Sequence, residues 1–162
     1  MIEITENIII NANINLVWSF ISDFSKSLLF NRFHIKIDLP SEYSISKIKK
    51  FKIIHNFGFG NYEMLAEVKN VNPPKHIALE EYYIKDKNKG FPHTINYNLK
   101  SINDKTKIIY TLEGTYGGKV QDLSFKPIVK GVMIEELLNI KNAIESSESA
   151  SKSIPGKSIK PI

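Results

Sequence analysis

The hydrophobic residues of this chain repeat with a period of two over most of its length, and this alternation restricts the fold more than any other feature. Isoleucines occupy positions 2, 4, 8 and 10 with mostly polar residues between them, as in a strand with one buried face. Short polar turns separate the alternating runs, which predicts an antiparallel meander rather than parallel crossover units. Further strands are expected at residues 33–39, 49–57, 62–71, 76–84, 91–99 and 107–118.

The phase of two of these strands decides which polar side chains face the core. In "FHIKIDL" the alternation places Phe33, Ile35 and Ile37 inward, so His34 is expected on the solvent side. The strand 76–84 has a strand-like composition but an ambiguous phase. Either Glu80 or Glu81 must share the inward face with a tyrosine there.

The stretch "NINLVWSFISDF", residues 13–24, interrupts the alternation with the period of a surface helix. Its apolar residues fall at i, i+3, i+4 and i+7, and Asn13 is well placed to cap the first turn. Trp18, the one tryptophan of the chain, lies at the edge of this stripe. A second short helix is expected at residues 25–30.

A long amphipathic helix is expected near the end of the sequence. Pro127 suits its first turn, and apolar residues then recur at intervals of three and four. This stripe consists of Val129, Met133, Leu137, Ile140 and Ile144. Residues 147–162 hold too little apolar surface to offset their ordering entropy, so we predict a disordered Ser/Lys/Pro tail and a single domain over residues 1–146.

Composition excludes several classes of function. The 162 residues include no cysteine, which removes disulfides, thiolate metal sites and thiol catalysis. Neither a signal sequence nor an apolar run long enough to span a membrane is present, so we expect a soluble cytoplasmic protein. The net charge of +5 comes almost entirely from lysine, Arg32 being the one arginine, and we expect no nucleic-acid binding.

The order of these elements predicts an α+β fold in which a curved seven-stranded antiparallel sheet wraps around the long C-terminal helix, with two short helices after the first strand. "IIINANINLVWSFISDF", "VKNVNPPKHIALEEY" and "IEELLNIKNAIES" resemble the START-related, birch-pollen-allergen-like helix-grip superfamily (SRPBCC), which includes polyketide cyclase/dehydrase-like members. The matching positions are Ala12, Val17, Trp18, Asp23, Pro73 and Pro74. These motifs are structural, and no catalytic signature accompanies them.

The resemblance implies an apolar cavity between the sheet and the long helix that binds lipids, quinones, steroids or polyketides. The inferred inward set is rich in aromatic residues, which fits either a packed core or a cavity with apolar walls and a few polar tips. The candidate ligand-binding residues are Trp18, Phe51, His55, Phe57, Tyr62, Met64, Tyr83, Phe91, His93, Tyr97, Tyr110, Tyr116, Val129, Met133 and Leu137.

Three residues are candidates for proton transfer. His55 and His93 fall on faces assigned inward, and a histidine titrates near neutral pH. Glu80, Glu81 and Glu113 are the acidic residues considered, and Glu81 is the one retained, since burial would raise the pKa of an inward carboxylate. The alternative is that each side chain has no role in proton transfer and either forms its hydrogen bonds within the core or faces solvent. Because the four histidines lack metal-ligand spacing along the chain, we expect no metal and no cofactor.

Three functions remain open from the sequence. The first is binding of a hydrophobic small molecule, with or without its transport. The second is a cyclase- or dehydratase-like enzyme that uses a cavity histidine with a glutamate or tyrosine, and the third is a protein-interaction module or dimer. The lysines of the tail, Lys152, Lys157 and Lys160, suit a solvated terminus, and the alternative is contact with a membrane surface or an enzyme partner. The sequence does not distinguish a monomer from a homodimer.

Overall fold

The computed structural model describes residues 1–56 and 60–152, with side chains as far as residue 147. One sheet, three helices and a 3-10 turn make up the described part of the chain. In chain order they are β1 (Ile2–Ile10), α1 (Ile14–Ile21), α2 (Phe24–Ser27), η1 (Leu28–Phe30), β2 (His34–Asp38), β3 (Lys50–Asn56), β4 (Asn61–Asn72), β5 (His76–Tyr83), β6 (His93–Ile102), β7 (Lys105–Gly114) and α3 (Lys119–Lys152).

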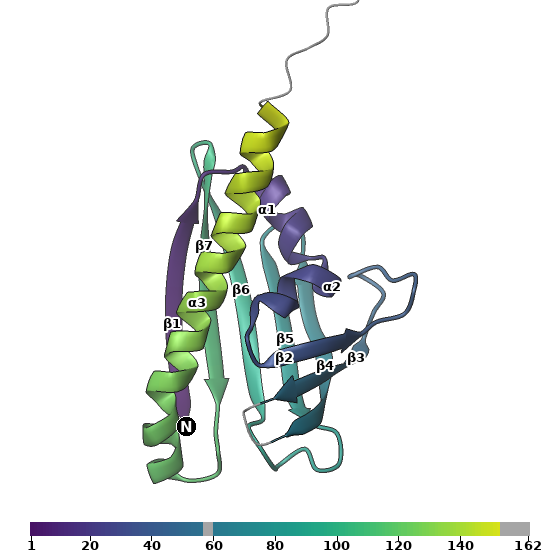
Figure 1. The fold of residues 1–162 in the computed structure, drawn as a ribbon, viewed down its shortest axis with the longest axis vertical. Coiled ribbons are helices and arrows are strands. Elements are labelled where there is room, and N and C mark those ends of the chain that lie inside the picture. Colours follow the sequence, from purple (N-terminus) through teal and green to yellow (C-terminus); the bar gives the residue numbers. More distant parts are fainter. Residues whose placement is uncertain (57–59, 153–162) are drawn as a thin grey trace, which may run out of the picture.

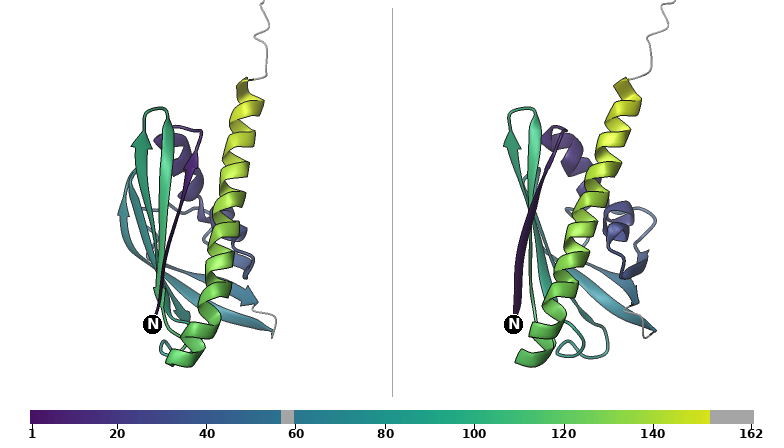
Figure 2. Two further views of the ribbon diagram at one scale, coloured as in Figure 1. Left: turned by 90° about the vertical axis from the view of Figure 1, so that its left-hand side faces the viewer. Right: turned by 60° about the vertical axis from the view of Figure 1, so that its left-hand side comes forward.

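The seven strands form one antiparallel sheet in the order β1-β7-β6-β5-β4-β3-β2. Strands β1 and β2 therefore occupy opposite edges, and α1, α2 and η1 carry the chain from one edge to the other (Figure 1). Helix α3 runs along one face of the curved sheet, next to β1 (Figure 2). This arrangement confirms the predicted α+β helix-grip architecture.

The core lies between the sheet and α3. All five predicted stripe residues of the helix, from Val129 to Ile144, are buried, and they face buried side chains of β1, β6 and β7. Helix α1 packs on the core through Val17 and Ile21. Asn13 is the N-cap of this helix, since its side chain accepts a hydrogen bond from the Leu16 amide.

Helix α3 begins at Lys119, so the prediction that Pro127 lies in its first turn is wrong. The Asp122 carboxylate explains the earlier start. It accepts hydrogen bonds from the Tyr116 amide and the Thr115 hydroxyl, which fixes the first turn to the end of β7. Pro127 has no N–H to donate to the Leu123 carbonyl, but Leu123 is 75% exposed and water can solvate that side of the helix.

The predicted phase of β2 is wrong at His34 and Ile35, whereas Ile37 packs against the core as predicted. A bulge between His34 and Lys36 leaves Ile35 without a partner, since His34 lies opposite His55 whereas Lys36 lies opposite Ile54. One extra residue reverses the faces of a strand. His34 is therefore buried, and Ile35 is 55% exposed.

The phase of β5, left open by the sequence, is settled by its neighbours. Ile77, Leu79 and Glu81 point inward and are fully buried. Glu80 points outward, where Lys69 and Lys87 form ion pairs with it. The adjacent glutamates thus lie on opposite faces of the sheet.

Most of the predicted tail, and Phe57, lie outside the described residues. Helix α3 is described as far as Lys152, and the predicted division of the chain at residue 146 stays a prediction. In the described part of the chain, no helix is both long and apolar enough to cross a membrane.

We expect the packing of α3 to depend on its buried stripe. Met133→Ala should lower the free energy of unfolding by about 3 kcal/mol, because it removes a fully buried side chain and leaves a cavity. The matched control is Ile134→Ala at the neighbouring, 38% exposed position, which should cost less than about 1 kcal/mol. Urea denaturation measures both, and equal losses would contradict the packing described here.

Candidate functional site

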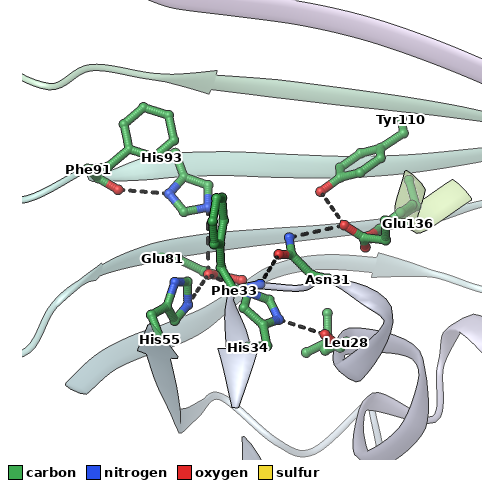
Figure 3. A network of polar contacts seen from close by, with 11 residues as sticks. Leu28, Asn31, Phe33, His34, His55, Glu81, Phe91, His93, Tyr110 and Glu136 are labelled. Atoms are coloured by element: carbon green, nitrogen blue, oxygen red, sulfur yellow. Dashed lines mark hydrogen bonds and ion pairs between the residues drawn. The ribbon is translucent and has the colours of Figure 1, made fainter. Parts of the chain in front are cut away.

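Glu81 lies at the centre of a buried polar cluster on the inner face of β5. Its side chain has no exposed surface, and three histidines surround one carboxylate oxygen (Figure 3). Glu81 Oε2 lies 3.2 Å from His55 Nε2, 3.6 Å from His93 Nε2 and 3.7 Å from His34 Nε2. The structure therefore brings together all three predicted proton-transfer candidates and adds His34, which the sequence placed outside.

The sheet register explains this convergence. His93 lies directly opposite Glu81 on the neighbouring strand β6. His34 and His55 lie opposite one another on β2 and β3, and the sheet curves at this edge (Figure 2). The curvature carries both rings over the inner face of β5, with a distance of 4.4 Å between the two ring centroids.

Backbone carbonyls orient two of the three imidazoles. His34 Nδ1 lies 2.7 Å from the Leu28 carbonyl oxygen, and His93 Nδ1 lies 2.8 Å from the Phe91 carbonyl oxygen. Because a carbonyl only accepts, each Nδ1 carries the hydrogen and each Nε2 is turned toward Glu81.

Gly114 on β7 makes room for His93. A Cβ at position 114 would lie 2.6 Å from the His93 Cβ and 2.9 Å from Phe91 Cε2. Both distances are far below van der Waals contact, so position 114 accepts no larger residue while His93 and Phe91 keep their places.

The charges within the cluster follow from burial and mutual attraction. Burial by itself raises the pKa of the Glu81 carboxyl, but the histidines, His34 foremost, outweigh it and hold this pKa well below its ordinary value. Burial lowers the pKa of His55 to about 4. Burial also opposes ionisation of His34, yet Glu81 raises its pKa overall. At neutral pH the cluster thus holds an ionised Glu81 beside a neutral His55, and the attraction of Glu81 favours the protonated form of His34.

The Glu81 carboxylate has ion-pair neighbours but lacks hydrogen-bond donors. Within residues 1–56 and 60–147, no donor meets hydrogen-bond geometry at either Glu81 oxygen. Across the same residues, His34, His55 and Glu81 are the group whose donor atoms cluster closely enough for one metal ion. Our expectation of no metal depended on spacing along the chain, and spacing says nothing about donors that lie on three different strands.

A second buried carboxylate, Glu136 of α3, lies beside this cluster and was missed by the sequence analysis. It is 1% exposed and accepts hydrogen bonds from the Tyr97 hydroxyl, from the Tyr110 hydroxyl at 3.4 Å and from Asn31 Nδ2 at 3.1 Å. A signal for it existed, because position 136 follows Met133 by three and precedes Ile140 by four and so belongs to the apolar stripe.

Burial raises the pKa of Glu136 to about 7. The Tyr97 and Tyr110 hydroxyls and the charge on His34 oppose this rise, and the charge on Glu81 adds to it. The side chain therefore exchanges its proton near neutral pH, which is the property required of a general acid or base.

Two adjoining spaces open beside these residues. An inner cavity of about 30 Å³ is bordered by Asn31, His93 and Tyr110, among others. A groove of about 450 Å³ lies at the end of the fold where α3 begins, and its lining is almost wholly apolar. Phe33, Phe91 and Tyr116 border both spaces.

A row of stacked rings connects the groove with the polar cluster. The centroid distances are 4.8 Å from His93 to Phe91, 4.3 Å from Phe91 to Tyr116 and 4.4 Å from Tyr116 to Phe125. The rings come from β6, from the loop that precedes it, from the loop after β7 and from α3. One end of the row contacts Glu81 and the other borders the groove.

The predicted ligand-binding residues fall into two groups. Those that border the groove or the inner cavity are Tyr62, Phe91, His93, Tyr110, Tyr116, Val129 and Met133. Those that border neither space are Trp18, Phe51, His55, Met64, Tyr83, Tyr97 and Leu137. In this second group, Phe51 stacks on Phe24 within the core and Tyr97 stacks on Tyr110. Bordering residues that the sequence analysis did not choose include Asn31, Phe33, Phe125 and Ile128.

The raised pKa of Glu136 predicts a pH-dependent stability. Between its ordinary pKa of 4.5 and its folded pKa of about 7, the folded protein binds a proton that the unfolded chain has released. Glu136 should therefore contribute a fall of about 3 kcal/mol in the free energy of unfolding as the pH rises through this interval, whereas His55, whose pKa burial lowers to about 4, contributes a rise. Glu136→Gln should remove the Glu136 contribution, which urea denaturation of the variant and of the unaltered protein from pH 4.5 to 8 measures as the difference between their stability curves.

Glu135→Gln is the matched control for that series. Glu135 is the next residue, is 40% exposed at its side chain and pairs with Arg32 at the surface. Its stability curve should run parallel to that of the unaltered protein. If the Glu136→Gln curve were parallel too, Glu136 would not be the group that titrates.

Comparisons with known proteins point to the fold alone. No protein-family model matches the chain, and no curated protein matches it in sequence. Among solved structures, a conserved protein from Geobacillus kaustophilus superposes with a TM-score of 0.71 at 18% identity, over 90% of this chain and 97% of the other. A START superfamily protein from Mycobacterium smegmatis superposes with a TM-score of 0.70 at 13% identity, over 89% and 97%.

An aromatase/cyclase is among the similar structures as well. The Zhui aromatase/cyclase from Streptomyces sp. R1128 superposes with a TM-score of 0.64 at 11% identity, over 95% of this chain and 97% of the other. Both the START superfamily protein and the aromatase/cyclase thus match nearly the whole described structure. This chain has the helix-grip fold of START-related proteins and polyketide aromatase/cyclases.

Proposed function

We propose that the protein binds a hydrophobic small molecule in the groove between the start of α3 and the strand ends next to it. The observation that carries this proposal is the groove itself, whose volume of about 450 Å³ lies within the usual range for small-ligand sites. Its walls are mainly aromatic, from Phe33, Tyr62, Phe91, Tyr116 and Phe125. Such walls favour an apolar, flat ligand body that stacks on the rings.

The inner cavity suggests how such a ligand would be oriented. It has room for about one water molecule, and His93 and Tyr110 present polar atoms beside it. A ligand that lies along Phe91 and Tyr116 would place a carbonyl or hydroxyl at this end. Quinones, steroids and aromatic polyketides combine a flat body with such a group, and a lipid would have to bend to reach it. If the protein also delivers the ligand to a membrane or an enzyme, it acts as a carrier.

The second candidate function is proton-transfer catalysis of the cyclase or dehydratase type. It is supported by Tyr110, which borders the inner cavity and also donates a hydrogen bond to Glu136, the carboxyl with a pKa of about 7. A proton could pass between Glu136 and a ligand by way of the Tyr110 hydroxyl. Mass spectrometry of a ligand incubated with the protein tests this, since loss of water or ring closure that disappears in Tyr110→Phe supports an enzyme. A ligand that returns unchanged supports a carrier.

We expect Ile128 to contribute to the binding of hydrophobic ligands. Ile128 borders the groove and is 52% exposed, so Ile128→Gln should weaken binding of the neutral fluorescent probe N-phenyl-1-naphthylamine about threefold to tenfold. Leu138→Gln, at a 47% exposed position of the same helix away from the groove, is the matched control and should bind normally. Fluorescence titration measures the dissociation constants.

Native mass spectrometry of protein purified from its own host complements this titration. A co-purified small molecule that Ile128→Gln retains less well supports the proposal. Equal probe binding by all three proteins, together with no retained small molecule, would refute it and would favour a protein-interaction module.

A further inference from the structure

We propose that His34, His55 and Glu81 form a binding site for one divalent transition-metal ion, of which Zn²⁺ is the ion that these ligand types and spacings suit best. The site is separate from the groove and does not depend on which molecule the groove binds. Two imidazole nitrogens and one carboxylate oxygen are a common ligand set for Zn²⁺, which accepts nitrogen and oxygen donors in a tetrahedral arrangement.

The distances between the donor atoms match such a site. One donor atom from each residue lies within 4.8 Å of the other two. Zn²⁺ bonds of ~2.1 Å in tetrahedral geometry separate neighbouring ligand atoms by about 3.4 Å. The observed separations from Glu81 Oε2 are 3.2 Å to His55 Nε2 and 3.7 Å to His34 Nε2, so an ion fits without large movements of the backbone.

Backbone carbonyls hold the histidine rings in the way that is usual around a bound metal ion. The Leu28 carbonyl fixes the hydrogen of His34 on Nδ1, so that the neutral ring presents the lone pair of Nε2 to the cluster. Histidine ligands of metals usually donate their other ring N–H in this way, which sets the tautomer and the ring orientation. The Phe91 carbonyl holds His93 in the same manner.

The buried charge of the Glu81 carboxylate favours a cation at this position. It is wholly buried, and no described residue donates a hydrogen bond to it. A buried carboxylate is costly unless cations or donors surround it. Protonation of His34 provides one such partner, and a divalent ion between the three side chains would provide a stronger one. Metal binding would then displace the His34 proton.

His93 stands next to the site and is not one of the three ligands. Its Nε2 lies 3.6 Å from Glu81 Oε2, and its ring borders the inner cavity, which has room for about one water molecule. Three protein ligands leave a fourth position on Zn²⁺ for water. His93 is the side chain best placed to accept a hydrogen bond from a water bound there.

Direct metal binding tests the proposal. The full chain is stripped with chelator and titrated with Zn²⁺ in a calorimeter, and Co²⁺ is then added as a spectroscopic probe. We expect one equivalent of Zn²⁺ to bind, a rise in the midpoint of thermal unfolding, and the visible absorption of four-coordinate Co²⁺. Glu81→Gln and His55→Gln, each verified by circular dichroism to be folded, should each weaken binding at least tenfold.

His76→Gln is the matched control. His76 lies on the same strand as Glu81, but its ring nitrogens contact Asn70 and Asn96 outside the cluster. This variant should bind Zn²⁺ as the unaltered protein does. The proposal is overturned if the stripped unaltered protein binds no stoichiometric Zn²⁺ or Co²⁺. It is equally overturned if the folded Glu81→Gln and His55→Gln variants bind normally, or if His76→Gln alone loses binding. The cluster would then be an ion-pair network.

Discussion

The burial of one ionised carboxylate, Glu81, is the constraint around which the interior of this protein is arranged. A carboxylate without solvent requires polar partners, and here three imidazoles from three separate strands surround it. The bulge in β2 turns His34 inward, the cross-strand register places His93 opposite, and backbone carbonyls orient both rings.

The interior is consequently divided between two environments. In the part of the core near α1, apolar side chains fill the space between the sheet and α3. Toward the start of α3, the Glu81 cluster and Glu136 form a polar interior that a row of stacked rings joins to an apolar groove. An apolar entrance that leads to a small polar end is the arrangement expected of a site that both binds and orients a ligand.

The sequence was informative where a pattern repeats and uninformative where a single residue breaks it. The seven strands, the three helical segments and their order followed from hydrophobic periods, residue composition and the polar turns between the runs. One bulge reversed the phase of β2 at His34 and Ile35, and the contacts of Asp122 moved the start of α3 before Pro127. His55, His93 and Glu81 were chosen individually, but their convergence depends on register and curvature that no local pattern reveals. Glu136 could have been found, since it lies within the apolar stripe of its helix.

The bulge in β2 has an additional effect on the solution behaviour of the molecule. Strand β2 is an edge of the sheet, and a regular edge strand offers unpaired amides and carbonyls to which another chain can add. A bulge distorts this row of groups, and β2 is also short and exposes the charged Lys36. The opposite edge is β1, which lies next to α3 and whose Ile9 carbonyl accepts a hydrogen bond from Lys141 of that helix. The extra residue of the bulge, Ile35, thus turns His34 inward and also disfavours the pairing of another chain with the β2 edge. A substitution that straightened β2 would favour aggregation and would also disrupt the polar cluster.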